Sequence, residues 1–546
     1  MNIKHYILGL FISSFLAPVQ ANPVDTVSIQ ETAIPILIER QDNELLRIRL
    51  DAQHTQTFNE ISLEFGKKVN LQEIESIKLY YSGTEAVEKK GQFLFAPVEY
   101  VSGFRVGNTL SADPSYSILK QQIDHPGKIV TLKADQPLFP GINYFWISLQ
   151  MKPTASLLSK ISISVTDVKT NNQKVPFKMY GESRPHYLGI GVRHAGDDGI
   201  NAFRIPGIVT SKKGTLLAVY DIRHNSSVDL QEYVEIGLSR STNKGQSWEK
   251  MRVPMAFGET GGLPKAQNGV GDPAILVDET TGHIWIVAAW VHGLGNRRAW
   301  FNSQPGMNMT QTAQLMMVKS EDDGQTWSEP MNYTAQLKDP TWYFLLQGPG
   351  RGITMKDGTL VFAAQYIDSN RIPNACIIYS KDHGKKWDIS TLARTNTTEA
   401  QVAEIKPGVL MLNMRDNRGG SRAVSTTTDM GKTWMEHPSS RKALQEPVCM
   451  ASIIHVNASD NILGKDLLLF SNPNDTKERK KITIKASLDN GLSWEENNQL
   501  LLDAENGWGY SCLTMIDHET VGIFYESSVA HMTFQAIKLK DIIKTK

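Results

Sequence analysis

One turn of eight residues recurs five times in the second part of the chain, and no other feature restricts the fold as strongly. Each copy runs from a Ser or Thr through an Asp or Asn and a Gly to a Trp. The Asp or Asn can accept hydrogen bonds from amides across the turn, the Gly can adopt a positive φ, and the Trp can cover the end of a small sheet. The five copies occupy residues 241–248, 320–327, 380–387, 427–434 and 487–494.

The spacing of these turns predicts a β-propeller. By subtraction of their residue numbers, successive Trp residues lie 79, 60, 47 and 60 positions apart. Such spacing is too irregular for a solenoid of stacked repeats, but it suits four-stranded blades joined by loops of variable length. We therefore assign residues 181–546 to a propeller.

The pattern of residues 22–180 predicts a second all-β unit. Short segments at 46–50, 129–132 and 161–165 alternate apolar and polar side chains between clusters of Gly, Pro, Asn and Asp. This pattern is typical of antiparallel strands with one buried face. It predicts a separate β-sandwich that serves either as a carbohydrate-binding module or as a structural spacer.

The N-terminus carries the one long apolar stretch of the chain, residues 6–19, preceded by Lys4. It predicts a secretory signal peptide over residues 1–21, cut after Ala21. The alternative is an anchor helix, although a span needs roughly 18 to 20 apolar residues. We expect a mature chain without a stable membrane span, exported to the periplasm or the medium. Its three cysteines exclude a dense disulfide framework.

Charge and motif content exclude several classes of function. Lys and Arg number 57, as do Asp and Glu, so the formal net charge is zero. Without a basic excess we expect no nucleic-acid partner, and any anion specificity must be local. The sequence contains no His-Glu-x-x-His, no Cys-x-x-Cys and no Walker loop, so we expect neither a metal nor a cofactor.

The segment Phe203-Arg204-Ile205-Pro206 opens the repeat region and resembles the Phe-Arg-Ile-Pro motif of exo-sialidases. The recurrent turns are similar to the Asp boxes of the same enzymes, the bacterial exo-α-sialidases of glycoside hydrolase family thirty-three. The resemblance implies a six-bladed propeller whose boxes lie between the third and fourth strands of a blade, away from the active site. It also implies a sixth blade that is built from both ends of the region and needs no box.

The resemblance implies a set of substrate-binding and catalytic residues. Asp229 would be the acid/base on a loop, and Arg223 would contact the 4-hydroxyl of the sugar. Asp272 would lie near that hydroxyl and the N-acetyl pocket. Glu399 would partner the nucleophile, whereas Glu404, an odd number of residues further along the strand, would face the other side and be structural.

The remaining assignments concern the nucleophile and an arginine triad. Tyr510, in a Gly-Tyr-Ser turn, matches the catalytic tyrosine of the family, and Tyr525 on a nearby apolar strand is the rival candidate. Arg204, Arg415 and Arg479 would bind the sugar's carboxylate, and Arg479 is the one arginine in a segment rich in lysine.

These residue types fit the chemistry of sialic acid, which carries a carboxylate on its anomeric carbon. Three arginines supply bidentate, charge-assisted hydrogen bonds to that group. A carboxylate nucleophile would be repelled there, whereas a tyrosine activated by Glu399 would not, and Asp229 would protonate the leaving oxygen. The expected function is hydrolysis of terminal sialic acid from glycans, glycoproteins or glycolipids, with retention. The alternatives are a trans-sialidase, an intramolecular sialidase and a non-catalytic sialic-acid-binding propeller.

Overall fold

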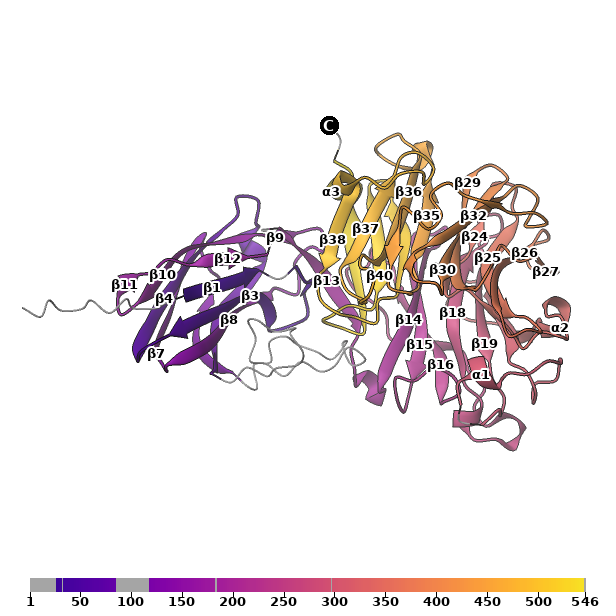
Figure 1. Cartoon of the computed structure of the whole chain (residues 1–546), viewed down its shortest axis with the longest axis horizontal. Coiled ribbons are helices and arrows are strands. Elements are labelled where there is room, and N and C mark those ends of the chain that lie inside the picture. Colours follow the sequence, from indigo (N-terminus) through magenta and orange to yellow (C-terminus); the bar gives the residue numbers. More distant parts are fainter. Residues whose placement is uncertain (1–25, 32, 85–116, 182–183, 296, 545–546) are drawn as a thin grey trace, which may run out of the picture.

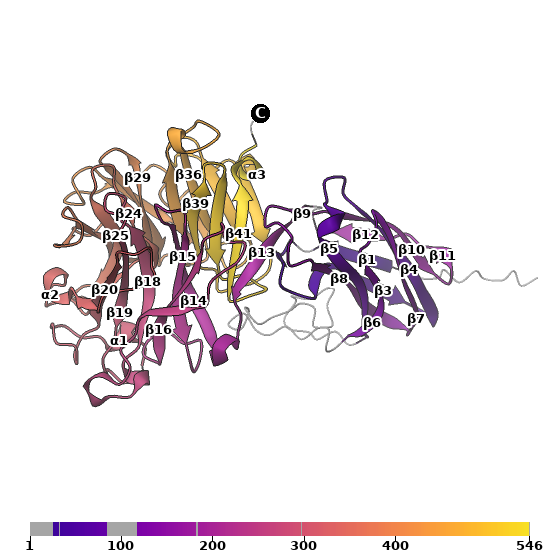
Figure 2. The same cartoon turned by 180° about the vertical axis from the view of Figure 1, so that it is seen from behind.

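The computed structural model describes residues 26–31, 33–84, 117–181, 184–295 and 297–544. Two all-β bodies lie side by side, the N-terminal one in indigo and the larger one from magenta to yellow (Figures 1 and 2). The predicted signal peptide, residues 1–21, lies outside the described residues. None of the helices in the described part of the chain has both the length and the apolar composition needed to span a bilayer.

The N-terminal body is a β-sandwich of two sheets. Alternate side chains of facing strands meet in a common core, where for example the rings of Phe58 and Phe145 pack edge to face 4.7 Å apart. Burial of each such large apolar side chain stabilises the fold by roughly 1.5 to 3 kcal/mol. In the described residues the strand order of the first sheet is β12 (Lys178–Tyr180), β1 (Thr26–Glu31), β3 (Asn43–Ala52), β8 (Gly141–Met151), β5 (Ile74–Gly83), β6 (Ile118–Asp124). The strand order of the second sheet is β11 (Gln173–Lys174), β10 (Ile163–Thr170), β4 (Gln56–Phe65), β7 (Ile129–Leu138).

The larger body is a six-bladed β-propeller, as the sequence predicts. Neighbouring blades contact each other mainly through their first strands, since β14 (Ala202–Thr210) contacts β18 (Val270–Val277) and β39 (Ser511–Asp517), and β29 (Thr397–Lys406) contacts β35 (Ser452–Val456). Strand β29 also contacts β25 (Leu360–Ile367), the second strand of the third blade. In the described chain, the first blade contains β14 (Ala202–Thr210), β15 (Leu216–Arg223), β16 (Val234–Ser241) and β17 (Arg252–Met255), and the second contains β18 (Val270–Val277), β19 (Ile284–Trp290), β20 (Gln314–Ser320), β21 (Met331–Asn332) and β23 (Gly350–Arg351). The third blade contains β22 (Phe344–Gln347), β24 (Ile353–Thr354), β25 (Leu360–Ile367), β26 (Pro373–Ser380), β27 (Asp388–Ile389) and β28 (Arg394–Thr395). The fourth blade contains β29 (Thr397–Lys406), β30 (Val409–Asp416), β32 (Ala423–Thr427) and β33 (Met435–Glu436), and the fifth contains β35 (Ser452–Val456), β36 (Leu467–Pro473), β37 (Ile482–Ser487) and β38 (Gln499–Asp503).

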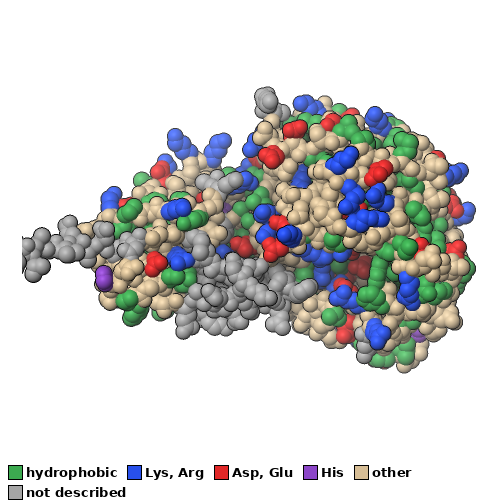
Figure 3. Space-filling view, viewed as in Figure 1, with side chains coloured by type: hydrophobic (Ala, Val, Ile, Leu, Met, Phe, Trp, Pro, Cys, Tyr) green, Lys and Arg blue, Asp and Glu red, His purple; other side chains and the backbone are tan. Residues whose placement is uncertain are grey.

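Short elements complete the propeller. A two-stranded ribbon joins β31 (Gly420–Ser421) to β34 (Gln445–Glu446), and three one-turn helices, α1 (Ala299–Asn302), α2 (Thr334–Leu337) and α3 (Leu539–Ile542), lie in connections or at the C-terminus. On the face seen in Figure 3, basic and acidic side chains are interspersed over the propeller.

The sixth blade joins both ends of the propeller region and also reaches into the sandwich. Its sheet contains β39 (Ser511–Asp517), β40 (Thr520–Tyr525), β41 (Met532–Lys538) and β13 (His186–Arg193). Strands β2 (Ile36–Leu37) and β9 (Lys160–Ile161) of the N-terminal part pair with β13. The two units therefore share a sheet, whereas the sequence analysis expected a separate sandwich, and the boundary predicted between residues 180 and 181 stays a prediction.

All five repeated turns fold in one way. In the first, Ser241 Oγ accepts from the Gly245 amide at 2.9 Å, and Asn243 Oδ1 accepts from the Ser247 amide at 3.0 Å. Equivalent bonds occur in the other four turns. Each turn connects the third strand of its blade to the fourth. In the sixth blade these two strands, β41 and β13, are not consecutive in the chain, which explains why it has no box.

Candidate active site

The candidate site lies at the end of the propeller opposite the box turns. Because the strands of a blade alternate in direction, the start of its first strand and the end of its second lie at one end, and the turn between its third and fourth strands lies at the other. Arg204, Asp272 and Glu399 stand near the starts of β14, β18 and β29, and Arg223 and Arg415 near the ends of β15 and β30. Topology thus gathers residues that are far apart in sequence.

A cavity of about 440 Å³ opens there. It brings together five of the residues singled out in the sequence, namely Asp229, Asp272, Glu399, Arg415 and Tyr510. The rest of its lining is largely apolar and includes Leu230, Ala299, Trp300, Phe301, Phe344, Leu346 and Pro373. The cavity therefore combines a charged side with an apolar one, as expected for a site that binds a small polar ligand with a few oriented polar groups.

Tyr510, Glu399 and Arg415 form a hydrogen-bonded set at the centre of the charged side. The Tyr510 hydroxyl donates to Glu399 Oε1 at 2.5 Å, and Arg415 Nη1 lies 2.5 Å from Glu399 Oε2 and 3.1 Å from the Tyr510 oxygen. Burial and the neighbouring charge of Glu399 raise the pKa of Tyr510 well above its usual value. The phenol is therefore protonated at rest, and Glu399 is placed to accept its proton.

Three arginines surround the same tyrosine ring. The guanidinium carbons of Arg204 and Arg479 lie 5.6 and 5.7 Å from the ring centroid. The third arginine, Arg415, contacts the hydroxyl of the same tyrosine. Arg479 donates to the backbone carbonyls of Trp508 and Val448, at 3.0 and 3.3 Å. Three guanidinium groups around one side chain create a local anion site, since a carboxylate can accept paired, charge-assisted hydrogen bonds from them.

Glu526, which the sequence analysis did not assign, holds this arrangement from behind. It is fully buried, and its Oε1 accepts from Arg204 Nε at 2.8 Å and from the Ile205 amide at 3.0 Å. Its Oε2 accepts from the Tyr510 amide at 3.0 Å. A single carboxylate therefore fixes an arginine and the backbone that carries the tyrosine. The signal in the sequence was a charged residue directly after the apolar strand β40.

Asp229 lies on the loop between β15 and β16, with half of its side chain exposed. Arg223 Nη1 donates to its Oδ1 at 2.9 Å, and Arg298 Nε lies 3.8 Å from its Oδ2. Burial alone would raise the pKa of Asp229, but the charges of Arg223 and Arg204 outweigh it and lower that pKa to about 2. In this arrangement Asp229 is ionised, so it becomes a proton donor only when the contact with Arg223 is broken.

A second residue missed in the sequence, Asp221, organises the neighbouring wall. It is buried, and its Oδ2 accepts from Arg223 Nε and Nη2 at 3.1 and 2.8 Å, while its Oδ1 accepts from the Asp272 amide at 2.8 Å. Burial and the adjacent Asp221 raise the pKa of Asp272 well above its usual value. A protonated Asp272 can donate a hydrogen bond as well as accept one. Because Asp221 stands two residues before Arg223 on one strand, their shared face was the available signal.

Bulges at the starts of three first strands aim the site residues inward. The register between first and second strands shifts after Arg204 in β14, around Asp272 in β18 and around Glu399 in β29. Ile205 and Asp272 have positive φ values of 64° and 59°. Such a value is costly for the β-branched Ile205, whereas Asp is among the residues that adopt it more readily. Bulges of this type re-aim side chains next to functional sites.

The rival and secondary residues of the sequence analysis lie elsewhere. Tyr525 is fully buried and donates to Gln535 Oε1 at 2.9 Å, outside the cavity. Glu404 lies near the far end of β29, where it accepts from the Lys356 and Gly408 amides at 2.7 and 2.8 Å. Neither takes part in the cluster around Tyr510.

Comparison with known proteins agrees with this geometry. The family description "N-terminal domain of BNR-repeat neuraminidase" matches residues 24–174, and "BNR repeat-like domain" matches residues 214–523. A sialidase of Bacteroides fragilis is 66% identical over 521 residues, covering 95% of this chain and 96% of its own. A sialidase of Paraclostridium sordellii is 31% identical over 351 residues, covering 60% of this chain and 81% of its own. The solved structure of a Hadza microbial sialidase superimposes with a TM-score of 0.90 at 58% identity, covering 94% of this chain and all of that one.

A propeller with Asp boxes, a buried tyrosine bonded to a glutamate, and three arginines around them define a glycoside hydrolase of the sialidase class. The chain belongs to the BNR-repeat sialidases, or neuraminidases, of glycoside hydrolase family thirty-three.

Proposed function

We propose that the protein is an exo-α-sialidase that hydrolyses terminal sialic acid with retention, through a tyrosyl-sialyl intermediate. The observation that carries the proposal is the 2.5 Å hydrogen bond from Tyr510 to Glu399 within a ring of three arginines. This pairing gives a weak nucleophile its base, and the arginines give the substrate carboxylate its binding site.

In the first step the phenol oxygen of Tyr510 attacks the anomeric carbon while its proton passes to Glu399. The glycosidic bond breaks, and Asp229 donates its proton to the departing oxygen. In the second step Asp229 removes a proton from a water molecule, whose oxygen attacks the same carbon. The bond to Tyr510 then breaks, and its oxygen recovers the proton from Glu399. Two inversions at one carbon return the original configuration.

Substrate binding has a defined role for Asp229 in this scheme. Its ion pair with Arg223 keeps the carboxylate ionised in the free protein. A sugar hydroxyl that takes over the hydrogen bonds of Arg223 would release Asp229, and the desolvated carboxyl would then hold a proton more readily. This supports a mechanism in which substrate binding allows Asp229 to take up the proton that it later donates.

Asp229→Asn is expected to slow release of a natural sugar far more than release of a good leaving group. General acid catalysis is worth about 10²- to 10⁴-fold for a poor leaving group, whereas an aryl oxygen leaves with little protonation. We expect kcat/KM, which reports the step that expels the leaving group, to fall by about 10²-fold or more for sialyllactose and by clearly less for a methylumbelliferyl sialoside. Glu232→Gln on the same loop is the control. Equal losses on both substrates would contradict the assignment.

The products distinguish hydrolysis from its alternatives. Proton NMR of the reaction on sialyllactose is expected to show free α-sialic acid first, followed by slow mutarotation. An anhydro sugar as the product would identify the protein as an intramolecular sialidase. Transfer of sialic acid to added lactose, in place of its release, would identify it as a trans-sialidase. Binding without turnover would overturn the enzymatic proposal.

The substrates and the compartment complete the proposal. Sialylated glycans, glycoproteins and glycolipids carry the group that the three arginines fit. We propose that the chain is exported after removal of residues 1–21, a stretch with the charge and apolar pattern of a signal peptide. N-terminal sequencing of the protein recovered from the producing cells and their medium tests the cleavage.

A further inference from the structure

The loop of residues 526–531, between β40 and β41, supports the active site from behind. Glu526 begins the loop and bonds Arg204 Nε and the amides of Ile205 and Tyr510. His531 ends it and accepts from the Phe203 amide at 3.3 Å through Nδ1. Both ends of the loop are thus bonded to the segments that carry catalytic or binding residues.

The propeller fixes the middle of this loop through one buried carboxylate. Asp503, the last residue of β38, accepts from the Ser528 amide at 2.7 Å and from the Ser528 hydroxyl at 2.8 Å. Ser527 Oγ in turn accepts from the Val529 and Ala530 amides at 3.2 and 2.9 Å. These bonds hold the loop from its propeller side.

The N-terminal sandwich closes the other side of the same loop. Val529 and Ala530 form a buried apolar cluster with Ile34 and Leu37, which lie in or next to β2. The chain is anchored there by a hydrogen bond from the Ala504 amide to the Ala33 carbonyl at 2.7 Å.

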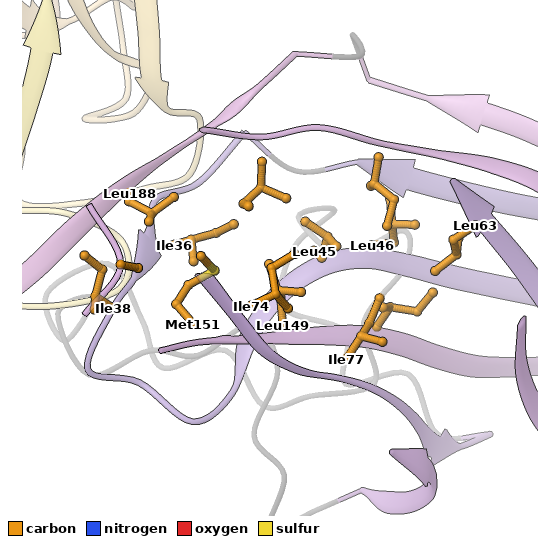
Figure 4. Close-up of a cluster of buried hydrophobic side chains, with 14 of the residues drawn as sticks. Ile36, Ile38, Leu45, Leu46, Leu63, Ile74, Ile77, Leu149, Met151 and Leu188 are labelled. Carbon is orange, nitrogen blue, oxygen red and sulfur yellow. The ribbon is translucent and has the colours of Figure 1, made fainter. Parts of the chain in front are cut away.

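The strand β2 couples this cluster to the core of the sandwich. Adjacent residues of a strand point to opposite faces, so Ile36 enters the sandwich core while Leu37 packs against the loop. Figure 4 shows Ile36 and Ile38 beside Leu188 of β13, in one continuous row with the sandwich residues Ile74 and Met151. A continuous core with a shared sheet holds the two units as one piece at this place.

We propose that the N-terminal sandwich is a positioning element of the active site: by packing Leu37 and Ile34 against the 526–531 loop, it fixes Glu526. Through Glu526 it sets the places of Arg204 and of the Tyr510 backbone. The inference rests on the proposed function of these residues, and it gives the sandwich a part in catalysis that requires no glycan-binding surface.

The test compares two equal truncations in the full-length protein. Leu37→Ala removes the contact with the loop, whereas Leu132→Ala opens a cavity in the same sandwich on β7, which lies away from the propeller in Figures 1 and 2. Both leucines are fully buried. The readouts are kcat, KM and the dissociation constant of 2,3-didehydro sialic acid, measured at a temperature where circular dichroism shows each variant folded.

We expect Leu37→Ala to lower kcat/KM by about ten- to a hundred-fold and to weaken the inhibitor, since small misplacements of catalytic groups are costly. Leu132→Ala should stay within about twofold of the parent at an equal loss of melting temperature. Leu37→Ile, which keeps the side-chain volume, should restore most of the activity.

A second variant keeps the test decisive if Leu37→Ala does not fold. Val529→Ala removes the same contact from the propeller side and should produce the same pattern. Equal activity losses in Leu37→Ala and Leu132→Ala, or full activity in both Leu37→Ala and Val529→Ala, would overturn the inference. Failure of the proposed function is seen separately, as absence of turnover by the parent protein.

Discussion

Tyr510→Phe is expected to lower kcat for a sialoside by at least about 10³-fold, the largest loss expected from any single change in this site. The substitution removes one oxygen, which donates to Glu399 at 2.5 Å and lies 3.1 Å from Arg415 Nη1. Without that oxygen no covalent intermediate forms, and only direct attack by water remains. The arginines stay in place, so KM should change much less than kcat.

Tyr525→Phe is the matched control for this prediction. It removes an equally buried hydroxyl, which donates to Gln535 in the sixth blade and does not line the cavity. Its kcat is expected to stay within a few-fold of the parent. Full activity of Tyr510→Phe together with loss in Tyr525→Phe would move the nucleophile to Tyr525. Mass spectrometry with a slowly turned-over 2,3-difluoro sialoside provides a direct check, because the adduct should map to the peptide with Tyr510.

The features that the sequence predicted correctly depend on local patterns. A box turn is determined by eight consecutive residues, so Ser241, Asn243 and Gly245 suffice to specify its hydrogen bonds. Period-two alternation likewise identifies a strand from its own residues. The all-β class and the propeller follow from such patterns and from their repetition.

The site needed more than local patterns. Tyr510 and Glu399 are 111 residues apart and meet only because their blades lie around one axis. The resemblance to exo-sialidases predicted this pair. No residue pattern predicted the bulges at which Ile205 and Asp272 adopt positive φ values. Glu526 was missed because its partners, Arg204 and the Tyr510 amide, come from two other segments of the chain. The pairing of β2 with β13 could not be predicted either, because a two-residue strand has no periodicity to detect.

Glu526→Gln is expected to lower kcat/KM by about 10²-fold or more, although the side chain never touches the substrate. The carboxylate accepts from three donors, on Arg204, Ile205 and Tyr510. An amide offers one oxygen and one NH₂ group, so at least one donor would face another donor. Loss of one partner from a buried ion pair costs about 3 to 5 kcal/mol, and that cost would be relieved by movement of Arg204.

Asp323 provides the control that separates positioning from stability. It is also buried, and its Oδ2 pairs with Arg240 Nη2 at 3.2 Å and accepts from the Thr215 hydroxyl at 2.7 Å. Asp323 lies in the box turn of residues 320–327, at the end of the propeller opposite the site. Asp323→Asn weakens a buried ion pair in the same way and should therefore lower the melting temperature about as much as Glu526→Gln. Arg240 stands near the end of β16 and Thr215 just before β15, both at the box-turn end of the propeller, so kcat/KM and binding of 2,3-didehydro sialic acid should fall less. If the two variants lose activity in proportion to their melting temperatures, Glu526 only stabilises the fold; if Glu526→Gln alone loses inhibitor affinity, its carboxylate sets the position of Arg204 in the anion site.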